Sequence, residues 1–184
     1  MIKPDGLFGN YTDEIKKVIL ESGFSILEEM MVQLDENYVT IFYAEHSKKS
    51  FFPRLVKYMT SGPVFVMVLE KVNAIADWRA LIGPTDARKA KVTHPNSIRA
   101  LCGLDSEKNC VHGSDSPQSA AREISFFFEE ISSGLERDRL DARRCRTYAS
   151  LGERKDGSGG CATSGKQISD SSGIGMERGP RMGV

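Results

Sequence analysis

The sequence lacks an excess of charge of either sign. Its 184 residues hold 25 basic and 25 acidic side chains, so the formal net charge at pH 7 is zero. A chain without net charge creates no long-range field that attracts nucleic acid or an anionic membrane surface. Nucleic-acid binding is therefore not expected, and any anion site must depend on a local cluster of cations.

Cysteine is scarce and gives no recognisable motif. Cys102, Cys110, Cys145 and Cys161 include no pair with the spacing of a metal site or a redox motif, so we expect free thiols in a reducing compartment. No apolar run is long enough to span a bilayer, and Pro4-Asp5-Gly6 would interrupt the apolar core of a secretion signal. These absences predict a cytoplasmic protein with no membrane partner.

Three signatures of catalytic chemistry are also missing. The chain has no Gly-x-x-x-x-Gly-Lys-Ser/Thr loop, no Gly-x-Ser-x-Gly elbow and no paired Cys or His with metal spacing. A P-loop is thereby excluded, and no metal site made of protein ligands is predicted.

Hydrophobic periodicity predicts alternating helices and strands before Gly134. The pattern is typical of a helix from Thr12 to Gly23, of a strand from Phe24 to Leu34 and of a central strand from Val64 to Leu69. Met1-Ile2-Lys3 and Val111 mark two further strands, and the first of these looks cut short. Further helices are expected from Asp35 or Asn37 to Tyr43, from Leu55 to Met59, from Asn73 to Leu81, from Ser97 to Leu101 and from Ser116 to Ile131.

The connections complete a split β-α-β pattern. Pro4-Asp5-Gly6 predicts a turn, and Thr85 to Pro95 has mixed charge without hydrophobic period, which predicts a loop. This order of elements predicts an α+β fold of ferredoxin-like type, an antiparallel sheet with flanking helices, over residues 1–133.

The composition changes at Gly134. Residues 134–184 hold ten of the seventeen glycines, many Ser and Arg, and only Tyr148 as an aromatic residue. Such a segment cannot bury enough apolar area to offset the entropy of ordering it. We therefore expect a disordered tail, whose arginines could give at most salt-sensitive, non-specific nucleic-acid binding.

The stretch from Asn109 to Ser116 is the strongest candidate for chemistry. It brings one imidazole, His112, to a Gly-Ser-Asp-Ser turn, and Ser116 and Pro117 then suit the start of a helix. A histidine with its ordinary pKa of about 6.5 is mostly neutral at pH 7 and is then a good nucleophile. Glu123, about two helical turns on, could hold the ring by its second nitrogen. A solvated surface histidine is the competing interpretation.

A dispersed set of cations, hydroxyls and aromatic rings could form a site with His112. Cations and hydroxyls suit a polyphosphate, and an aromatic face suits a nucleobase without choosing among bases. Taken singly, each of these residues is better explained as an ordinary surface or core residue. The members are Lys3, Tyr43, Phe51, Arg79, Thr85, Arg99, Asn109 and His112.

Together these residues resemble the nucleoside diphosphate kinases from Met1 to about Ser132. Three long motifs stand in the family's order and spacing, with Arg79, Leu81-x-Gly83-x-Thr85 and Ile98-Arg99 between them. The three are Ile2-Lys3-Pro4-Asp5-Gly6, Phe51-Phe52-x-x-Leu55-Val56-x-Tyr58-Met59-x-Ser61-Gly62-Pro63 and Asn109-x-x-His112-Gly113-Ser114-Asp115-Ser116.

The resemblance implies a ping-pong reaction in which His112 takes the terminal phosphoryl group of a nucleoside triphosphate and passes it to a nucleoside diphosphate. Glu123 would orient His112, and Tyr43 and Ser114 would lie near the transferred group. The other implied contacts are Lys3 and Asn109 with sugar and phosphate, Phe51 with the base, and Arg79, Thr85 and Arg99 with phosphate oxygens. Mg²⁺ would be held mainly by the nucleotide phosphates.

Three departures from the family pattern suggest an alternative. First, Gly83 to Arg99 looks longer than in housekeeping enzymes, which use this loop at subunit contacts. Second, the first strand lacks its usual beginning. Third, the Gly/Ser/Arg-rich tail replaces the usual C-terminal segment. The chain thus resembles divergent members that are fused to thioredoxin-like domains or associated with cilia and flagella. The resemblance leaves two roles open. One is a homo-oligomeric enzyme. The other is a weakly active structural module of an axonemal assembly, with axonemal or thioredoxin-domain partners.

Overall fold

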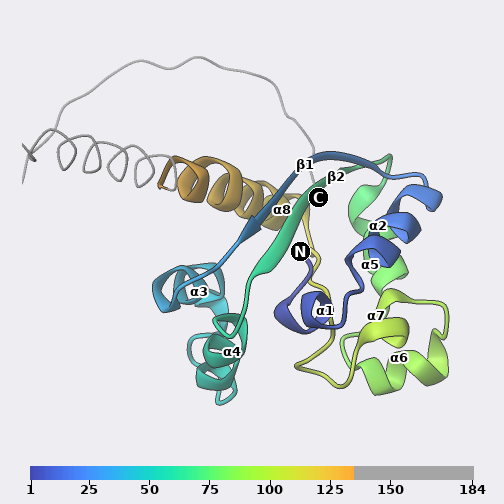
Figure 1. The fold of residues 1–184 in the computed structure, drawn as a ribbon, viewed down its shortest axis with the longest axis horizontal. Helices are drawn as coiled ribbons and strands as arrows, with labels where there is room; N and C mark the ends of the chain where they lie inside the picture. Colours follow the sequence, from blue (N-terminus) through green and yellow to red (C-terminus); the bar gives the residue numbers. More distant parts are fainter. Residues whose placement is uncertain (135–184) are drawn as a thin grey trace, which may run out of the picture. The chain divides into compact units, whose positions relative to one another are not determined.

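The computed structural model describes residues 1–134 (Figure 1). The chain divides into two units, and the first holds residues 1–130. Beyond Gly134, the predicted tail and with it Cys145, Tyr148 and Cys161 lie outside the described residues, so the domain boundary stays a prediction. No helix in the described part is long and apolar enough to cross a membrane.

Short helices surround two long strands. In chain order the elements are α1 Pro4–Phe8, α2 Thr12–Glu21, β1 Ser25–Val32, α3 Glu36–Phe42, η1 Ala44–His46, α4 Phe52–Met59, β2 Val64–Glu70, α5 Ala74–Ile82, α6 Ala87–Thr93, α7 Ile98–Cys102, α8 Pro117–Ile124 and the π-helical segment η2 Ser125–Ile131.

The sheet is antiparallel, and its spatial order differs from the sequence order. β1 pairs with β2 (Figure 1). In their register Met30 lies opposite Val66. On the other side of β2, Ile2 forms single antiparallel bridges to Phe65 and to Val111. The spatial order is therefore β1, β2, Ile2, Val111, which confirms the predicted ferredoxin-like arrangement.

The first strand is short, as its sequence predicts, yet its hydrogen bonds decide where the site forms. Ile2 exchanges both backbone hydrogen bonds with Phe65, at 2.6 and 3.0 Å. On the opposite side, the Lys3 N–H donates to the Cys110 carbonyl at 2.7 Å, and the His112 N–H donates to the Met1 carbonyl at 2.9 Å. Residues about 110 positions apart in sequence are thus fixed side by side.

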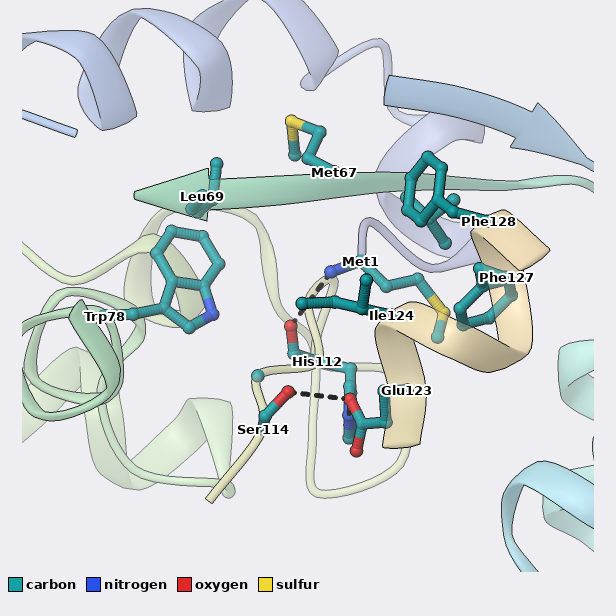
Figure 2. Close-up of a pocket in the computed structure, with 12 residues that line it drawn as sticks. Met1, Met67, Leu69, Trp78, His112, Ser114, Glu123, Ile124, Phe127 and Phe128 are labelled. Carbon is teal, nitrogen blue, oxygen red and sulfur yellow. Dashed lines mark hydrogen bonds and ion pairs between the residues drawn. The ribbon is translucent and has the colours of Figure 1, made fainter. Parts of the chain in front are cut away.

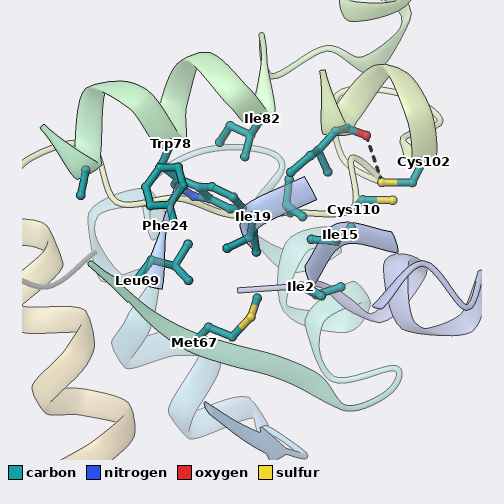
Figure 3. Packing of buried hydrophobic residues seen from close by; sticks show 13 residues of the cluster. Ile2, Ile15, Ile19, Phe24, Met67, Leu69, Trp78, Ile82, Cys102 and Cys110 are labelled. Carbon is teal, nitrogen blue, oxygen red and sulfur yellow. Dashed lines mark hydrogen bonds between the residues drawn. The ribbon is translucent and has the colours of Figure 1, made fainter. Parts of the chain in front are cut away.

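A cluster of buried side chains supports β2 from one side (Figure 3). Ile15 and Ile19 of α2 are fully buried, and Phe24 meets Trp78 of α5 edge to face, with ring centroids 6.1 Å apart. Aromatic pairs of this geometry contribute about 0.5–1.5 kcal/mol beyond the area they bury. Met67 of β2 packs in the same cluster, so α2 and α5 are held against the strand that borders Ile2.

The segment from Thr85 to Pro95, predicted to be a loop, contains α6, so that prediction is wrong. Ala87 and Ala90 lie one turn apart and are fully buried, and the Asp86 carboxylate accepts the Arg88 N–H at 3.0 Å at the helix start. Alanine has high helix propensity but contributes little to a hydrophobic pattern. A methyl group at Gly103 would lie 2.5 Å from Ala87 Cβ, so only small residues fit where α6 packs.

Two helix starts differ from the sequence expectation, and one agrees with it. The expected turn at Pro4-Asp5-Gly6 is the short helix α1, with proline at its first position. Asn73 does precede α5, but its φ is 60° and its side chain makes no capping hydrogen bond. Ser116 caps α8 as predicted, because its hydroxyl accepts the Ser119 N–H in a reciprocal capping box.

Candidate functional site

His112 ends the extended segment that pairs with the first strand, and its ring is held by the final helix. His112 Nε2 lies 2.9 Å from Glu123 Oε2 on α8, and Ser114 Oγ donates to the same carboxylate oxygen at 2.8 Å (Figure 2). Helix α8 begins at Pro117, five residues after His112 and directly after the Ser116 cap, so Glu123 on this helix can reach the ring. The structure thus brings together His112, Glu123 and Ser114, three of the predicted site residues.

The environment favours a neutral imidazole beside a charged carboxylate. Burial lowers the pKa of His112 below its ordinary value, although the hydrogen bond and charge of Glu123 oppose the shift. For Glu123, burial alone would raise the pKa, but the hydrogen bond from His112, the histidine charge and the Ser114 hydroxyl lower it. With Nε2–H donated to Glu123, Nδ1 carries the free lone pair at pH 7.

Aromatic rings line one side of His112. Its ring lies 5.4 Å from Phe42 and 6.1 Å from Tyr43, both in edge-to-face geometry. Tyr43 is buried, and burial raises the pKa of its phenol. Tyr43 in turn stacks on His46, whose ring lies 5.7 Å from Phe51. A continuous series of rings therefore connects His112 to Phe51, whose side chain is 38% exposed at the start of α4.

Lys3 and Asn109 form a buried pair next to the histidine segment. Lys3 Nζ donates to Asn109 Oδ1 at 2.8 Å, and both residues are buried. The Asn109 amide also donates to the carbonyl groups of Thr85 and Ser106, at 2.9 and 3.0 Å, which fixes its orientation. Burial, reinforced by the positive charge of Arg99, lowers the pKa of Lys3 to about 8.

Arg99 projects from α7 toward the same region. Its guanidinium donates to the Gly83 carbonyl at 2.8 Å and to the Val111 carbonyl at 3.1 Å, while its Nε is buried and has no hydrogen-bond partner. Burial, and then the nearby charge of Arg79, lower the pKa of Arg99 to about 10. A buried donor without a partner is costly unless an anion can bind there.

Arg79 and Thr85 are less well fixed than the other predicted residues. Arg79 is exposed, and its guanidinium reaches the Gly113 carbonyl only at 3.5 Å. Thr85 is also exposed and contacts Asn109 through its backbone carbonyl. Both residues are exposed, so close packing does not fix either side chain.

A small cavity borders His112. It has a volume of about 40 Å³ and is bordered by residues of β2, α5 and the α8–η2 region as well as by His112 and Glu123 (Figure 2). Ligand pockets usually measure about 300–1,000 Å³, so a nucleotide does not fit there. On this side Gly113 packs tightly, because a methyl group on it would lie 2.4 Å from Trp78 Nε1.

Asp5, Tyr58 and Cys110 have no role predicted from the sequence, although the first two lie within the recognised motifs and the third between Asn109 and His112. The Asp5 carboxylate accepts hydrogen bonds from the Tyr58 hydroxyl and from the Cys110 N–H. Cys110 has φ of 64°, which non-glycine residues rarely adopt. No residue pattern signals such a backbone conformation.

Comparison with known proteins identifies the class. The family model described as nucleoside diphosphate kinase matches residues 1–132. The chain is 67% identical over 134 residues to "Probable nucleoside diphosphate kinase 5" of Arabidopsis thaliana, a match covering 73% of this chain and 93% of that protein. The solved nucleoside diphosphate kinase of Aquifex aeolicus superposes with a TM-score of 0.69 at 41% identity, covering 71% of this chain and 92% of that one. The chain belongs to the nucleoside diphosphate kinase family.

Its animal relatives place it with divergent members. The chain is 45% identical over 128 residues to "Nucleoside diphosphate kinase homolog 5" of Danio rerio, covering 70% of this chain, and 42% identical over 131 residues to the human protein of that name, covering 71%. These matches cover 58% and 61% of the two animal proteins, so the chain spans less than two thirds of their length.

Proposed function

We propose that this chain is an active nucleoside diphosphate kinase that works through a phosphohistidine on His112. The observation that carries the proposal is the imidazole itself, which is kept neutral, held at Nε2 by Glu123 and left with a free lone pair at Nδ1. The lone pair attacks the terminal phosphorus of a nucleoside triphosphate, a P–N bond forms, and the bridging P–O bond breaks. The departing nucleoside diphosphate keeps that electron pair. A second nucleoside diphosphate reverses the step.

The cations around His112 suit this reaction. Phosphoryl transfer depends mainly on alignment of the reactants and on neutralisation of charge at the phosphoryl oxygens. Lys3 and Arg99 are buried cations with lowered pKa values, and Arg99 Nε has no partner, so a phosphate would supply the missing counter-charge and acceptor. In this proposal Lys3 and Asn109 contact phosphate and sugar, Arg79 and Thr85 turn toward the phosphates, and Tyr43 and Ser114 lie near the transferred group.

Mg²⁺ fits this site as part of the nucleotide. Among residues 1–134 no group of three His, Cys, Asp or Glu side chains could hold a metal ion. Mg²⁺ often takes most of its ligands from substrate phosphates and water. When bound, the ion neutralises phosphate charge, while Lys3 and Arg99 hold the same phosphates from the protein side.

The direct test is a phosphoenzyme assay on the purified full chain. Incubation with ATP carrying a labelled γ-phosphate and Mg²⁺ should give a stoichiometric label on the protein that is stable to base and lost in acid. Adding unlabelled GDP should then transfer the label to GTP. An unlabelled but folded and nucleotide-binding protein would contradict the proposal.

A folded protein that binds nucleotide but takes up no label would instead favour the alternative role, a weakly active structural module of a ciliary or axonemal assembly. The residue types favour the enzyme over that module, because within residues 1–134 every predicted catalytic position holds the residue that the family resemblance implies. The cytoplasmic or ciliary location, homo-oligomerisation and axonemal or thioredoxin-domain partners stay predictions.

Replacing Phe51 by alanine should raise KM for all nucleotides by a similar factor. A stacked base contributes about 1–3 kcal/mol by alanine substitution, which corresponds to roughly 5- to 150-fold. Stacking does not distinguish among bases, so ADP, GDP and CDP should be affected alike. The matched control is Phe8→Ala, since Phe8 is 70% exposed and lies against Gly62. A loss confined to one base would show that Phe51 does not act by stacking.

A further inference from the structure

Cys110 forms a strained turn two residues before His112. The Val111 N–H donates to the Asn109 carbonyl at 2.8 Å, which closes a three-residue turn around Cys110, whose φ is 64°. A γ-turn with positive φ is rare and strained for any residue with a side chain. Cys110 is nevertheless fully buried, so the surrounding structure must hold this conformation.

Lys3 and Asp5 bind the backbone carbonyl and the backbone N–H of Cys110. Its carbonyl accepts the Lys3 N–H at 2.7 Å, and its N–H donates to Asp5 Oδ2 at 3.0 Å. The same Lys3 supplies the ammonium that binds Asn109, so the turn and the proposed phosphate contacts are built from one set of residues.

The Asp5 carboxylate is itself fixed from the other side. Its second oxygen, Oδ1, accepts the Tyr58 hydroxyl from α4. Lys3 Nζ lies 5.7 Å above the Tyr58 ring, so Tyr58 packs against both members of the Lys3–Asp5 segment. A carboxylate can accept both hydrogen bonds at once, whereas a carboxamide has only one acceptor oxygen.

We propose that Asp5 is a positioning residue, whose carboxylate, braced by Tyr58, holds the strained turn at Cys110 and thereby aligns Asn109 and His112 for phosphoryl transfer. Within residues 1–134 the Asp5 carboxylate makes no hydrogen bond or ion pair with the imidazole or with the proposed phosphate ligands; it acts through the backbone of Cys110. The inference rests on the proposed function, because alignment matters only if His112 is the nucleophile.

The test combines Asp5→Ala with a residue that adopts the turn without strain. Alanine removes both acceptor oxygens, whereas asparagine would keep one for the Cys110 N–H. Asp5→Ala should lower kcat about 10- to 100-fold, as expected for loss of a charge-assisted hydrogen bond, with little change in KM. Glycine adopts positive φ readily, so in a Cys110→Gly background Asp5→Ala should lower kcat only about threefold or less. Equal losses from Asp5→Ala in both backgrounds would overturn the proposal. Asp13→Ala, the same chemical change at an exposed position of α2, should leave kcat unchanged.

A second readout does not depend on activity. Hydrogen exchange at the backbone amide of residue 110, followed by NMR in protein labelled with ¹⁵N-cysteine, should be slow in the wild type and at least about tenfold faster in Asp5→Ala. Unchanged exchange would overturn the proposal even if the wild type forms no phosphoenzyme, so the two hypotheses fail separately. If Asp5→Ala does not fold, Tyr58→Phe replaces it. This variant keeps the Asp5–Cys110 hydrogen bond but loses the one from Tyr58, and it too should speed exchange at residue 110.

Discussion

Replacing His112 by alanine is expected to abolish phosphoryl transfer, with kcat/KM reduced by at least about 10⁴-fold, the scale seen when a catalytic nucleophile is removed. The reason is that the other side chains around His112 bind and orient but offer no nucleophile in its place: Glu123 and Ser114 bond to each other, and Lys3 is tied to Asn109. The measurements are single-turnover transfer from labelled ATP and retention of label on the protein.

The fold should survive this change, because His112 is partly exposed and its backbone bonds to Met1 persist in alanine. Nucleotide binding, followed by fluorescence titration, should therefore remain. His94→Ala is the matched control, since His94 is exposed and its ring hydrogen-bonds, within the described residues, to the neighbouring Thr93 hydroxyl alone. Acid-labile label that persists in His112→Ala would show that another residue carries the phosphoryl group.

The second large expected effect is a bell-shaped pH profile of kcat/KM whose alkaline limb belongs to Lys3. On the acid side, kcat/KM should rise as the imidazolium loses its proton, below the ordinary histidine pKa because burial lowers it. On the alkaline side, kcat/KM should fall as Lys3, with a pKa of about 8, loses the charge that binds phosphate. Bound phosphate raises the pKa of Lys3, so the alkaline limb of kcat should lie at higher pH than that of kcat/KM.

Lys3→Gln tests this assignment. It should lower kcat/KM at pH 7 by about 10²- to 10³-fold, the usual effect of removing one preorganised electrostatic contact, and it should remove the limb near pH 8. Lys17→Gln, at an exposed position that forms a surface salt bridge with Glu21, should keep both limbs. An alkaline limb that remains in Lys3→Gln would assign it to another group.

The lowered pKa of Lys3 also predicts how the stability of the ligand-free protein depends on pH. The folded state binds this proton less tightly than the unfolded chain, whose lysine has its ordinary pKa of 10.5. The lysine therefore opposes folding below about pH 8, and stability should rise between pH 8 and 10.5, where the folded state has lost the proton and the unfolded chain still binds it. Bound nucleotide should reverse this trend.

The sequence predicts the elements that have a strong hydrophobic period. The stripe at Ile15 and Ile19 and the apolar run of β2 correspond to real elements, and the spatial order of the strands follows from the split β-α-β pattern. α6 escapes prediction because Ala87 and Ala90 define its buried face without raising its hydrophobicity. α1 is too short to show a helical period, so its Pro4-Asp5-Gly6 sequence predicts a turn.

For the candidate site, the motifs identify residue types but not the backbone between them. The proximity of His112 to Glu123 can be expected from the spacing of a capped helix, and the structure places them 2.9 Å apart. The left-handed turn at Cys110 cannot be expected, because cysteine has no preference for positive φ and the turn is imposed by Asp5, 105 positions away. Long-range hydrogen bonds of this kind have no local sequence signature.

The pairing of the first strand with the segment around His112 also determines when the site can exist during folding. The Lys3–Asn109 bond joins positions 106 apart, whereas β1 and β2 and the helices beside them close much shorter loops. Contacts between residues far apart in sequence form late, because closing the long loop between them has an entropic cost. During synthesis, a chain that has emerged only as far as α7 would lack Asn109, Cys110 and His112, so the partners that fix Met1 and Lys3 would not yet be present.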